Sequence, residues 1–275
     1  MTAFRAFRIH QEGGKVAPKL EAIELDSLTA GEVVIRVRYS TINYKDALAA
    51  TGAGKILRKF PLVGGIDLSG EVESSSDPAF QKGQKVLVTG GGLSETYDGG
   101  YAEFARVKSE NVIALPDELD EFQAMALGTA GFTAALAVHR MEQNGLQPSG
   151  GDILVTGATG GVGSLAIDML ASRGYTVVAL TGKEQSGAYL EQIGASRVLL
   201  RKDVQLGSKP LEEGRWAGAI DNVGGDVLAW LTRTVNPWGS IASVGMAASF
   251  ELKTTVLPFI LRGVNLLGIN SVTTP

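Results

Sequence analysis

Two patterns of hydrophobic positions divide the chain. In the first third, apolar and polar residues alternate over short segments: within Glu32–Tyr39, one face carries Arg36 and Arg38, and the other carries Val33, Ile35, Val37 and Tyr39. This is the period of a half-buried strand. Further strands are predicted at Ala3–Ile9, Asp67–Glu73, Lys85–Thr89 and Tyr101–Val107. Turn-forming clusters separate these segments, so we expect a small antiparallel β-barrel with one short helix at Asn43–Ala50.

The pattern changes near residue 120. Asp120–Met141 predicts two helices that meet at a bend near Gly128 and Gly131. From Gly151 on, apolar strands are predicted at 152–157, 176–180, 197–200, 217–223, 240–245 and 264–270, and helices at 161–172, 183–193 and 226–235. Strands without alternation are buried on both faces, so this part predicts a doubly wound parallel sheet and an α/β fold class. We expect Trp216, Trp230 and Trp238 to pack against that sheet and its helices.

A glycine-rich turn, Gly157–Gly163 (GATGGVG), lies between the first of these strands and the first helix. A dinucleotide site needs a tight turn there, a backbone without Cβ atoms beside the pyrophosphate, and the free N–H groups of a helix start. The strand, turn and helix context makes the motif informative. We therefore predict a dinucleotide site, although a glycine turn with only a packing role is the alternative.

The residues after the next strand decide which nucleotide fits. An NAD site usually has an acidic residue there, whereas this chain has Thr181, Gly182 and Lys183. Thr181 can donate to a 2′-phosphate and Lys183 can neutralise it, and Arg201, after the third strand, can reach the same side. NADPH is therefore favoured, with Glu184 as the competing acidic residue.

Composition narrows the chemistry. A length of 275 residues suits two domains. The sequence has no apolar run of membrane-span length and no visible signal peptide, so we expect a cytoplasmic protein. Its net charge of −4 argues against binding of nucleic acid. The chain has no cysteine and only two histidines, His10 and His139, which we expect at the surface or at an interface. No metal is therefore predicted, and zinc-assisted alcohol oxidation is excluded. Hydride addition to a polarised C=C bond or to a quinone is the chemistry that remains.

Candidate catalytic residues cluster in the first part of the chain. Tyr44 can place its ring against a nicotinamide or donate a proton, Asn43 can donate to a developing oxyanion, and Asp67 lies in a glycine-flanked segment, FPLVGGIDLSG. Structural alternatives stay open: a partly buried aromatic side chain for Tyr44, a solvated helical face for Lys45 and Asp46, and a strand-end cap for Asp67.

Several motifs together resemble one family: NYKDALAATG, FPLVGGIDLSG, GTAGFTA, VTGATGGVGS, WAGAIDNVGG, LPFILRGV and GINSVTTP. They look like the zinc-free, quinone-oxidoreductase-like branch of the medium-chain dehydrogenases/reductases and, within it, the bacterial acrylyl-CoA reductase (NADPH) group. The resemblance covers Phe4 to Pro275. It implies a GroES-like β-barrel lobe over 1–124, a Rossmann NADPH-binding domain over 125–270, and a start of the return to the first lobe at 271–275. It also implies a homodimer and a chain that continues past Pro275 in other members.

The resemblance also implies a set of NADPH contacts: Tyr44, Thr159, Gly160, Gly161, Val162, Thr181, Gly182, Lys183, Arg201, Met246, Ile260 and Ser271. The implied reaction is reduction of the C=C bond of acryloyl-CoA to propanoyl-CoA. An NADPH-dependent reductase of quinones or other α,β-unsaturated carbonyls is one alternative, and an NADPH-binding protein without turnover is another. For a coenzyme A substrate, Lys55, Arg58 and Lys59 form a basic cluster, for which solvated surface charge is the favoured interpretation.

Overall fold

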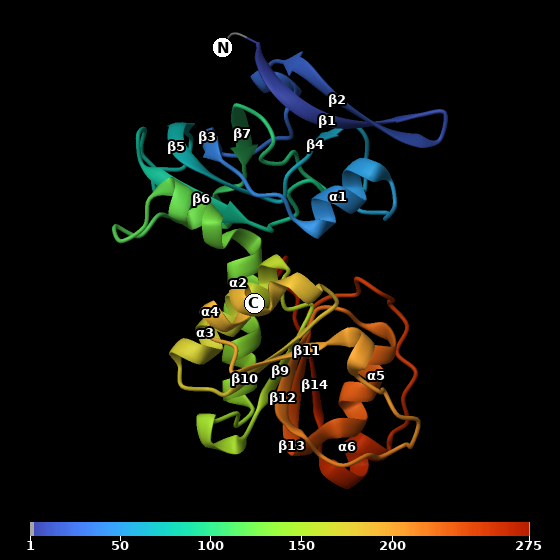
Figure 1. Cartoon of the computed structure of the whole chain (residues 1–275). Helices are drawn as coiled ribbons and strands as arrows, with labels where there is room; N and C mark the ends of the chain where they lie inside the picture. Colours follow the sequence, from blue (N-terminus) through green and yellow to red (C-terminus); the bar gives the residue numbers. More distant parts are fainter. Residues whose placement is uncertain (1–2, 275) are drawn as a thin grey trace. The chain divides into compact units, whose positions relative to one another are not determined.

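The computed structural model describes residues 3–274, which form two compact units (Figure 1). One unit holds the chain up to Phe132 together with the segment from Ser271 on, and the other is Thr133–Asn270. The domain boundary expected after residue 124 stays a prediction. Within the described residues, no helix is both long and apolar enough to span a bilayer.

The first unit contains two antiparallel sheets and one short helix. A three-stranded sheet has the order β2-β1-β4, and a five-stranded sheet has the order β7-β3-β5-β6-β8. The strands are β1 (Phe4–Glu12), β2 (Lys15–Ile23), β3 (Val33–Tyr39), β4 (Leu62–Val63), β5 (Asp67–Ser75), β6 (Lys85–Thr89), β7 (Phe104–Val107) and β8 (Ile113–Ala114), and the helix is α1 (Tyr44–Thr51). The alternation predicted for β3 holds only in part: Val33 and Ile35 are fully buried in the core of the larger sheet, but Val34 is buried too and Tyr39 is 46% exposed. The register of β3 against β5 shifts at Val34/Ile35 and at Val37/Tyr39, which interrupts the strict alternation.

Strand β2 was not predicted from the sequence. It pairs with β1 along its whole length, from Phe4 opposite Ile23 to Glu12 opposite Lys15. Most of its side chains are exposed or half-buried, and it contains Pro18, so it has neither the apolar alternation nor the composition of a typical strand. An edge strand tolerates both features, because one side of it needs no partner.

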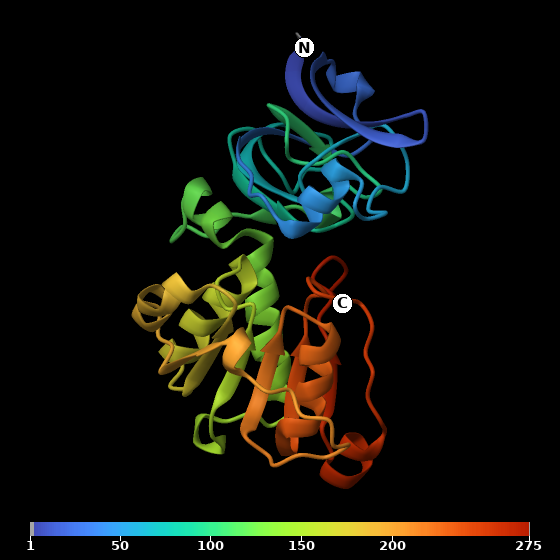
Figure 2. The ribbon, with the colours of Figure 1, turned by 45° about the vertical axis from the view of Figure 1, so that its right-hand side comes forward.

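The second unit is built on a six-stranded parallel sheet of order β11-β10-β9-β12-β13-β14. Its elements are β9 (Ile153–Thr156), β10 (Val177–Thr181), β11 (Arg197–Leu200), β12 (Trp216–Asp221), β13 (Val235–Ser243), β14 (Asn265–Gly268), α3 (Gly161–Ser172), α4 (Gly187–Gln192), α5 (Gly225–Thr234) and α6 (Leu257–Arg262). Figures 1 and 2 show α3 and α4 on one face of the sheet and α5 on the other. Separate apolar cores lie on the two faces, and β9, β10 and β12 are buried throughout. The predicted doubly wound α/β fold is confirmed.

Three details of this unit differ from the sequence prediction. The helix expected over 183–193 begins as a 3₁₀ turn at Glu184–Ser186 and continues as α4, and α6 was not predicted. Trp216 and Trp230 are buried and pack edge to face, with ring centroids 6.1 Å apart, as expected. Trp238 is 77% exposed, so the packing role expected for it was wrong. It belongs to a bulge of β13, in which Val235 pairs with Trp216 but the next paired residue is Ser240, and this bulge carries the ring out of the sheet.

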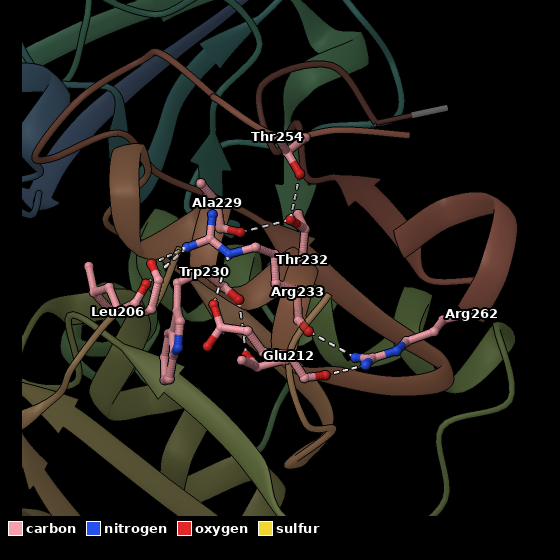
Figure 3. Close-up of polar contacts among 10 residues, drawn as sticks. Leu206, Glu212, Ala229, Trp230, Thr232, Arg233, Thr254 and Arg262 are labelled. Carbon is pink, nitrogen blue, oxygen red and sulfur yellow. Dashed lines mark hydrogen bonds and ion pairs between the residues drawn. The ribbon is translucent and has the colours of Figure 1, made fainter. Parts of the chain in front are cut away.

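The crossover from β11 to β12 contains no α-helix and is anchored by two arginines (Figure 3). Arg233, in the last turn of α5, donates to the carbonyl oxygens of Leu206 (3.0 Å) and Gly207 (3.2 Å) and pairs with the Glu212 carboxylate at 3.2 Å. Arg262, at the end of α6, donates to the Arg233 carbonyl at 2.8 Å and to the Glu212 carbonyl. Cations at this position also satisfy the open carbonyl groups at the end of α5.

Helix α2 (Glu121–Gln143) contains the bend that its glycines predicted. The break is at Gly128, with φ 51° and ψ −156°, a backbone conformation that is essentially restricted to glycine. A Cβ atom there would lie 3.0 Å from Thr41 Cγ2 and 3.3 Å from Asp67 Oδ2. Both the conformation and the space therefore require glycine.

Replacing Gly128 with alanine is expected to lower the free energy of unfolding by about 2 kcal/mol, because the backbone conformation becomes strained. The matched control is Gly187→Ala. Gly187 has helical dihedral angles and no atom near the position of an added Cβ, so this change should raise the stability by about 0.5 kcal/mol. Urea unfolding followed by circular dichroism measures both. Equal effects of the two substitutions would contradict the assignment of strain to Gly128.

Candidate functional site

The glycine turn follows β9 at the carboxyl edge of the parallel sheet and leads directly into α3. Gly157 has φ 58°, and a Cβ on Gly163 would lie 2.4 Å from the Gly157 carbonyl oxygen. Both positions therefore require glycine, one for the tight turn and one for the close approach of helix and strand. These are the two structural tasks that the dinucleotide motif assigns to its glycines.

The start of α3 can hold an anion. Its N-cap is Gly160, which has no side chain to bond the open N–H groups of the first helical turn. Gly160 and Gly161 are exposed, and no acidic side chain occupies the first turn. Open N–H groups and the positive end of the helix dipole favour a phosphate at this point, so the residues fit the pyrophosphate of a dinucleotide.

The residues predicted to select the nucleotide follow neighbouring strands at the same edge. Thr181 ends β10 and is buried, and its Oγ1 accepts a hydrogen bond from the Lys183 N–H at 3.0 Å. Lys183 is exposed. Arg201 directly follows β11 and lines a hollow of about 290 Å³, together with Gly224 and Lys253 among others. Two cations and a hydroxyl group therefore lie at the ends of adjacent strands, as a 2′-phosphate requires.

Glu184, the acidic competitor, is already engaged. Its carboxylate pairs with Lys202 Nζ at 2.6 Å, and both side chains are largely exposed. The ion pair partly neutralises the one acidic residue that would favour a ribose 2′-hydroxyl over a 2′-phosphate. The surroundings therefore favour NADPH more clearly than the sequence did.

Asp221, at the end of β12, ties the glycine turn to the next turn along the sheet. It is fully buried; its Oδ1 accepts a hydrogen bond from Thr156 Oγ1 (2.6 Å), and its Oδ2 accepts one from the Gly224 N–H (2.8 Å). Burial raises the pKa of this carboxyl group, and these hydrogen bonds oppose the rise. Sequence reasoning missed Asp221, although its position at the end of an apolar strand, in AIDNVGG, was a usable signal.

The other predicted cofactor residues fall in different places. Met246 follows β13 at the carboxyl edge and is 56% exposed. Ile260 lies in α6, the helix that ends at Arg262. Arg262 donates hydrogen bonds to the carbonyl oxygens of Arg233 and Val235, so the end of α6 lies beside the start of β13. Helix α6, which Figure 1 labels, is therefore at the opposite, amino edge of the sheet, and Ile260 lies there with it. Ser271 belongs to the first unit, where the adjacent Val272 carbonyl accepts the Gly91 N–H at 3.2 Å.

In the first unit, Asp67 is the centre of a buried polar cluster. Its carboxylate receives five hydrogen bonds of 2.6 to 3.1 Å, from the N–H and Oγ1 of Thr41, from Asn43 Nδ2, and from the N–H and Oγ1 of Thr129. Burial alone would raise its pKa, but these hydrogen bonds outweigh burial and hold the pKa of Asp67 below its ordinary value. Asp67 is fully buried, so it positions its neighbours and is not exposed to a substrate.

Asn43 has little donor capacity left. Its amide nitrogen carries two hydrogens, and these are directed to Thr41 Oγ1 at 3.0 Å and to Asp67 Oδ2 at 2.9 Å. Donation to an oxyanion would require one of these bonds to break. Asn43 is also the N-cap residue of α1, which makes Tyr44 the first residue of the helix.

Tyr44 is the accessible member of the predicted catalytic group. Its side chain is 61% exposed and has no hydrogen bond to another described residue. Lys45 pairs with Glu95 at 2.6 Å. Asp46 is buried and accepts hydrogen bonds from the N–H groups of Asn43 (2.8 Å) and Ile66 (3.1 Å), so the solvated face considered for it was wrong. Burial raises the pKa of Asp46.

Two protein-family profiles match the chain: "Alcohol dehydrogenase GroES-like domain" over residues 29–117 and "Zinc-binding dehydrogenase" over residues 161–274. The second description implies zinc, but the donors do not fit. The chain has no cysteine, His10 bonds Glu21 at 3.0 Å, and His139 is exposed. Within residues 3–274, no three His, Asp or Glu side chains form a group that could hold a metal. The side chains of this protein therefore do not fit a zinc ion.

Relatives align over nearly the whole chain. The "Probable acrylyl-CoA reductase AcuI" of Escherichia coli (strain K12) is 49% identical over 271 residues, which is 98% of this chain and 83% of the relative. The "Putative quinone oxidoreductase YhfP" of Bacillus subtilis (strain 168) is 48% identical over 275 residues, which is 100% of this chain and 83% of the relative.

Solved structures agree with the sequence comparison. The crystal structure of Escherichia coli K-12 YhdH with bound NADPH has a TM-score of 0.95 and 49% identity, and the match covers 98% of this chain and 83% of that one. The two units, the glycine turn of the second unit and these relatives lead to one conclusion. The chain belongs to the quinone-oxidoreductase-like branch of the medium-chain dehydrogenases/reductases, the branch that includes the acrylyl-CoA reductases.

Proposed function

We propose that the protein reduces the C=C bond of acryloyl-CoA to propanoyl-CoA with NADPH. One hydride and one proton are added across the double bond, and NADPH is oxidised to NADP⁺. The observation that carries the proposal is the 49% identity to an acrylyl-CoA reductase, which extends through both units. The open helix start at Gly160 and the cations Lys183 and Arg201 support NADPH as the cofactor.

The chain's own residues have three tasks in this reaction: they bind the pyrophosphate, they bind the 2′-phosphate, and they donate a hydrogen bond to the substrate. Thr159–Val162 perform the first task, and Thr181, Gly182, Lys183 and Arg201 perform the second. Bound NADPH supplies a hydride for the β-carbon of the substrate. The thioester oxygen then gains negative charge, which a hydrogen-bond donor stabilises.

Tyr44 is the residue that we assign to this donor role. Its hydroxyl group is accessible, whereas the two N–H groups of Asn43 are engaged. Asn43 and Asp67 act as positioning residues: Asp67 holds Asn43, and Asn43 begins the helix that presents Tyr44. We keep Met246, Ile260 and Ser271 as proposed cofactor contacts, of which Ile260 has the weakest geometric support because it lies at the amino edge of the sheet.

A second candidate function is reduction of quinones or of small α,β-unsaturated carbonyl compounds. The 48% identity to a putative quinone oxidoreductase favours it. A quinone also gains negative charge on an oxygen atom when it accepts hydride, so the same donor would serve. The two functions therefore differ in the substrate and not in the chemistry of the site.

Steady-state oxidation of NADPH, followed by the loss of its absorbance, tests the proposal. We expect kcat/KM for acryloyl-CoA to exceed that for 1,4-benzoquinone by at least about a hundredfold, and NADH to be a poorer donor than NADPH because Lys183 and Arg201 lose their anion. Higher efficiency with the quinone would favour the second function. NADPH binding without oxidation by any of these acceptors would indicate a protein without turnover.

Tyr44→Phe removes the proposed donor and keeps the ring. We expect kcat with acryloyl-CoA to fall by about ten- to a hundredfold, with little change in the Kd of NADPH. Tyr189→Phe is the matched control, because Tyr189 is a 48% exposed tyrosine in α4 and should leave kcat unchanged. An unaltered kcat in Tyr44→Phe would remove Tyr44 from the donor role.

We further propose that the protein is a cytoplasmic homodimer that pairs through β14. This strand is at the edge of the six-stranded sheet, and its Leu266 is 37% exposed. The neighbouring helix α6 exposes Leu261 (64%). An open edge beside exposed apolar side chains is the combination that a second copy would cover.

Sedimentation equilibrium is expected to give twice the chain mass for the unsubstituted protein. Leu266→Lys places a charge on the proposed interface and should shift the equilibrium to monomer. Leu20→Lys changes an exposed leucine on β2, in the other unit, and should leave the dimer intact. A monomeric unsubstituted protein, or a dimer that withstands Leu266→Lys, would contradict pairing through β14.

A further inference from the structure

Asn222 follows β12 and lies against the glycine turn. Its N–H donates to Thr156 Oγ1 at 3.0 Å, and its Nδ2 donates to the Thr156 carbonyl at 2.8 Å. A Cβ atom on Gly157 would lie 3.2 Å from Asn222 Cβ. The side chain is therefore fixed to the last residue of β9 and packs beside the first glycine of the turn.

These contacts also fix the orientation of the amide. A backbone carbonyl can only accept, so the NH₂ group of Asn222 must face Thr156, and Oδ1 must face away from it. Oδ1 is buried and has no hydrogen-bond partner among the described residues. Buried acceptors are nearly always paired in folded proteins, so this atom calls for a donor that residues 3–274 do not provide.

The strand order indicates where on the cofactor that donor lies. Lys183 and Arg201 follow β10 and β11, on one side of β9, and mark the adenosine half with its 2′-phosphate. Asn222 follows β12, on the other side of β9. A dinucleotide lies across the carboxyl edge with its pyrophosphate at the β9 turn, which places its nicotinamide half on the β12 side. A phosphate oxygen would repel Oδ1, whereas a ribose hydroxyl can donate to it.

We infer that Asn222 is a further cofactor-binding residue, whose Oδ1 accepts a hydrogen bond from a hydroxyl of the nicotinamide ribose. The inference rests on the proposed function, because it takes NADPH as the cofactor. The turn after β13 lies against the Asn222 backbone, where a Cβ on Gly245 would be 2.5 Å from the Asn222 carbonyl oxygen. Oδ1 is enclosed in the structure, so the inference requires this turn, which exposes Met246, to open for the cofactor.

Binding measurements with two ligands test the inference without turnover. Isothermal titration calorimetry gives Kd for NADPH and for adenosine 2′,5′-bisphosphate, which contains the adenosine half with its 2′-phosphate but no nicotinamide half. For Asn222→Ala we expect Kd of NADPH to rise about three- to tenfold, the usual effect of one lost hydrogen bond, and Kd of the bisphosphate to stay unchanged.

Two further variants make the comparison specific. Lys183→Gln removes a proposed 2′-phosphate contact and should weaken the binding of both ligands. Asn236→Ala changes an asparagine near the start of β13, at the amino edge, and should affect neither ligand. Unchanged binding of the bisphosphate also shows that the Asn222→Ala variant has kept its fold around the turn.

Two results would overturn the inference while the proposed function stands. One is an unchanged Kd of NADPH in Asn222→Ala, and the other is an equal loss of affinity for both ligands, which would mean that Asn222 only shapes the turn. Failure of the unsubstituted protein to bind NADPH would overturn the proposed function, and the inference with it.

Discussion

The first unit is organised around one negative charge that is buried without a cation beside it. Asp67 has no ion pair within the described residues. Its carboxylate is stabilised in the ionised form by five hydrogen bonds from Thr41, Asn43 and Thr129. These donors come from three segments: the end of β3, the start of α1 and the bend in α2. The carboxylate also faces the open N–H group of the helical segment that follows Gly128, where a negative charge is favourable. Strand, helix start and bend are thus specified together, because the anion is stable only when all three are in place.

In the second unit, backbone N–H groups provide the predicted binding site, whereas the first unit is organised by the side chain of Asp67. Its predicted ligand is an anion, and the groups available to bind it are the N–H groups at the start of α3. Such a site requires the strands to end at one edge and the turn to be held firmly. Asp221 meets the second requirement, because one carboxylate joins Thr156, just before the glycine turn, to Gly224, just before α5. Both units therefore use a buried aspartate to fix the backbone around the residues that we propose to act.

The sequence predicted those features that follow from local pattern. The strands β6 and β11 and the helix α3 have the predicted bounds, because their apolar runs end at clear turn residues. The bend at Gly128 was predicted because glycines interrupted a helical pattern. Strand β2 was missed because an edge strand needs no apolar alternation, and Trp238 was assigned wrongly because a bulge in β13 cannot be inferred from the residue type.

For the candidate site, the sequence predicted residue types but not how their hydrogen bonds are used. It favoured Asn43 as a donor, and the structure shows both of its N–H groups engaged. It missed Asp221 and gave no reason to single out Asn222, because their roles depend on contacts between strands that are distant in the chain. It could not show that Glu184 is paired with Lys202, or that Ile260 lies at the amino edge.

The crossover between β11 and β12 is held to the rest of the second unit mainly through its backbone. Arg233 and Arg262 hold it mainly through the carbonyl oxygens of Leu206, Gly207 and Glu212. Every amino acid supplies a carbonyl oxygen, so these bonds place almost no demand on which side chains the crossover carries. The segment that the two arginines hold has few side-chain constraints of its own: Glu212 needs its carboxylate for Arg233, and Leu206 packs against the apolar core. The contacts to carbonyl oxygens hold its path whatever side chains the remaining positions carry.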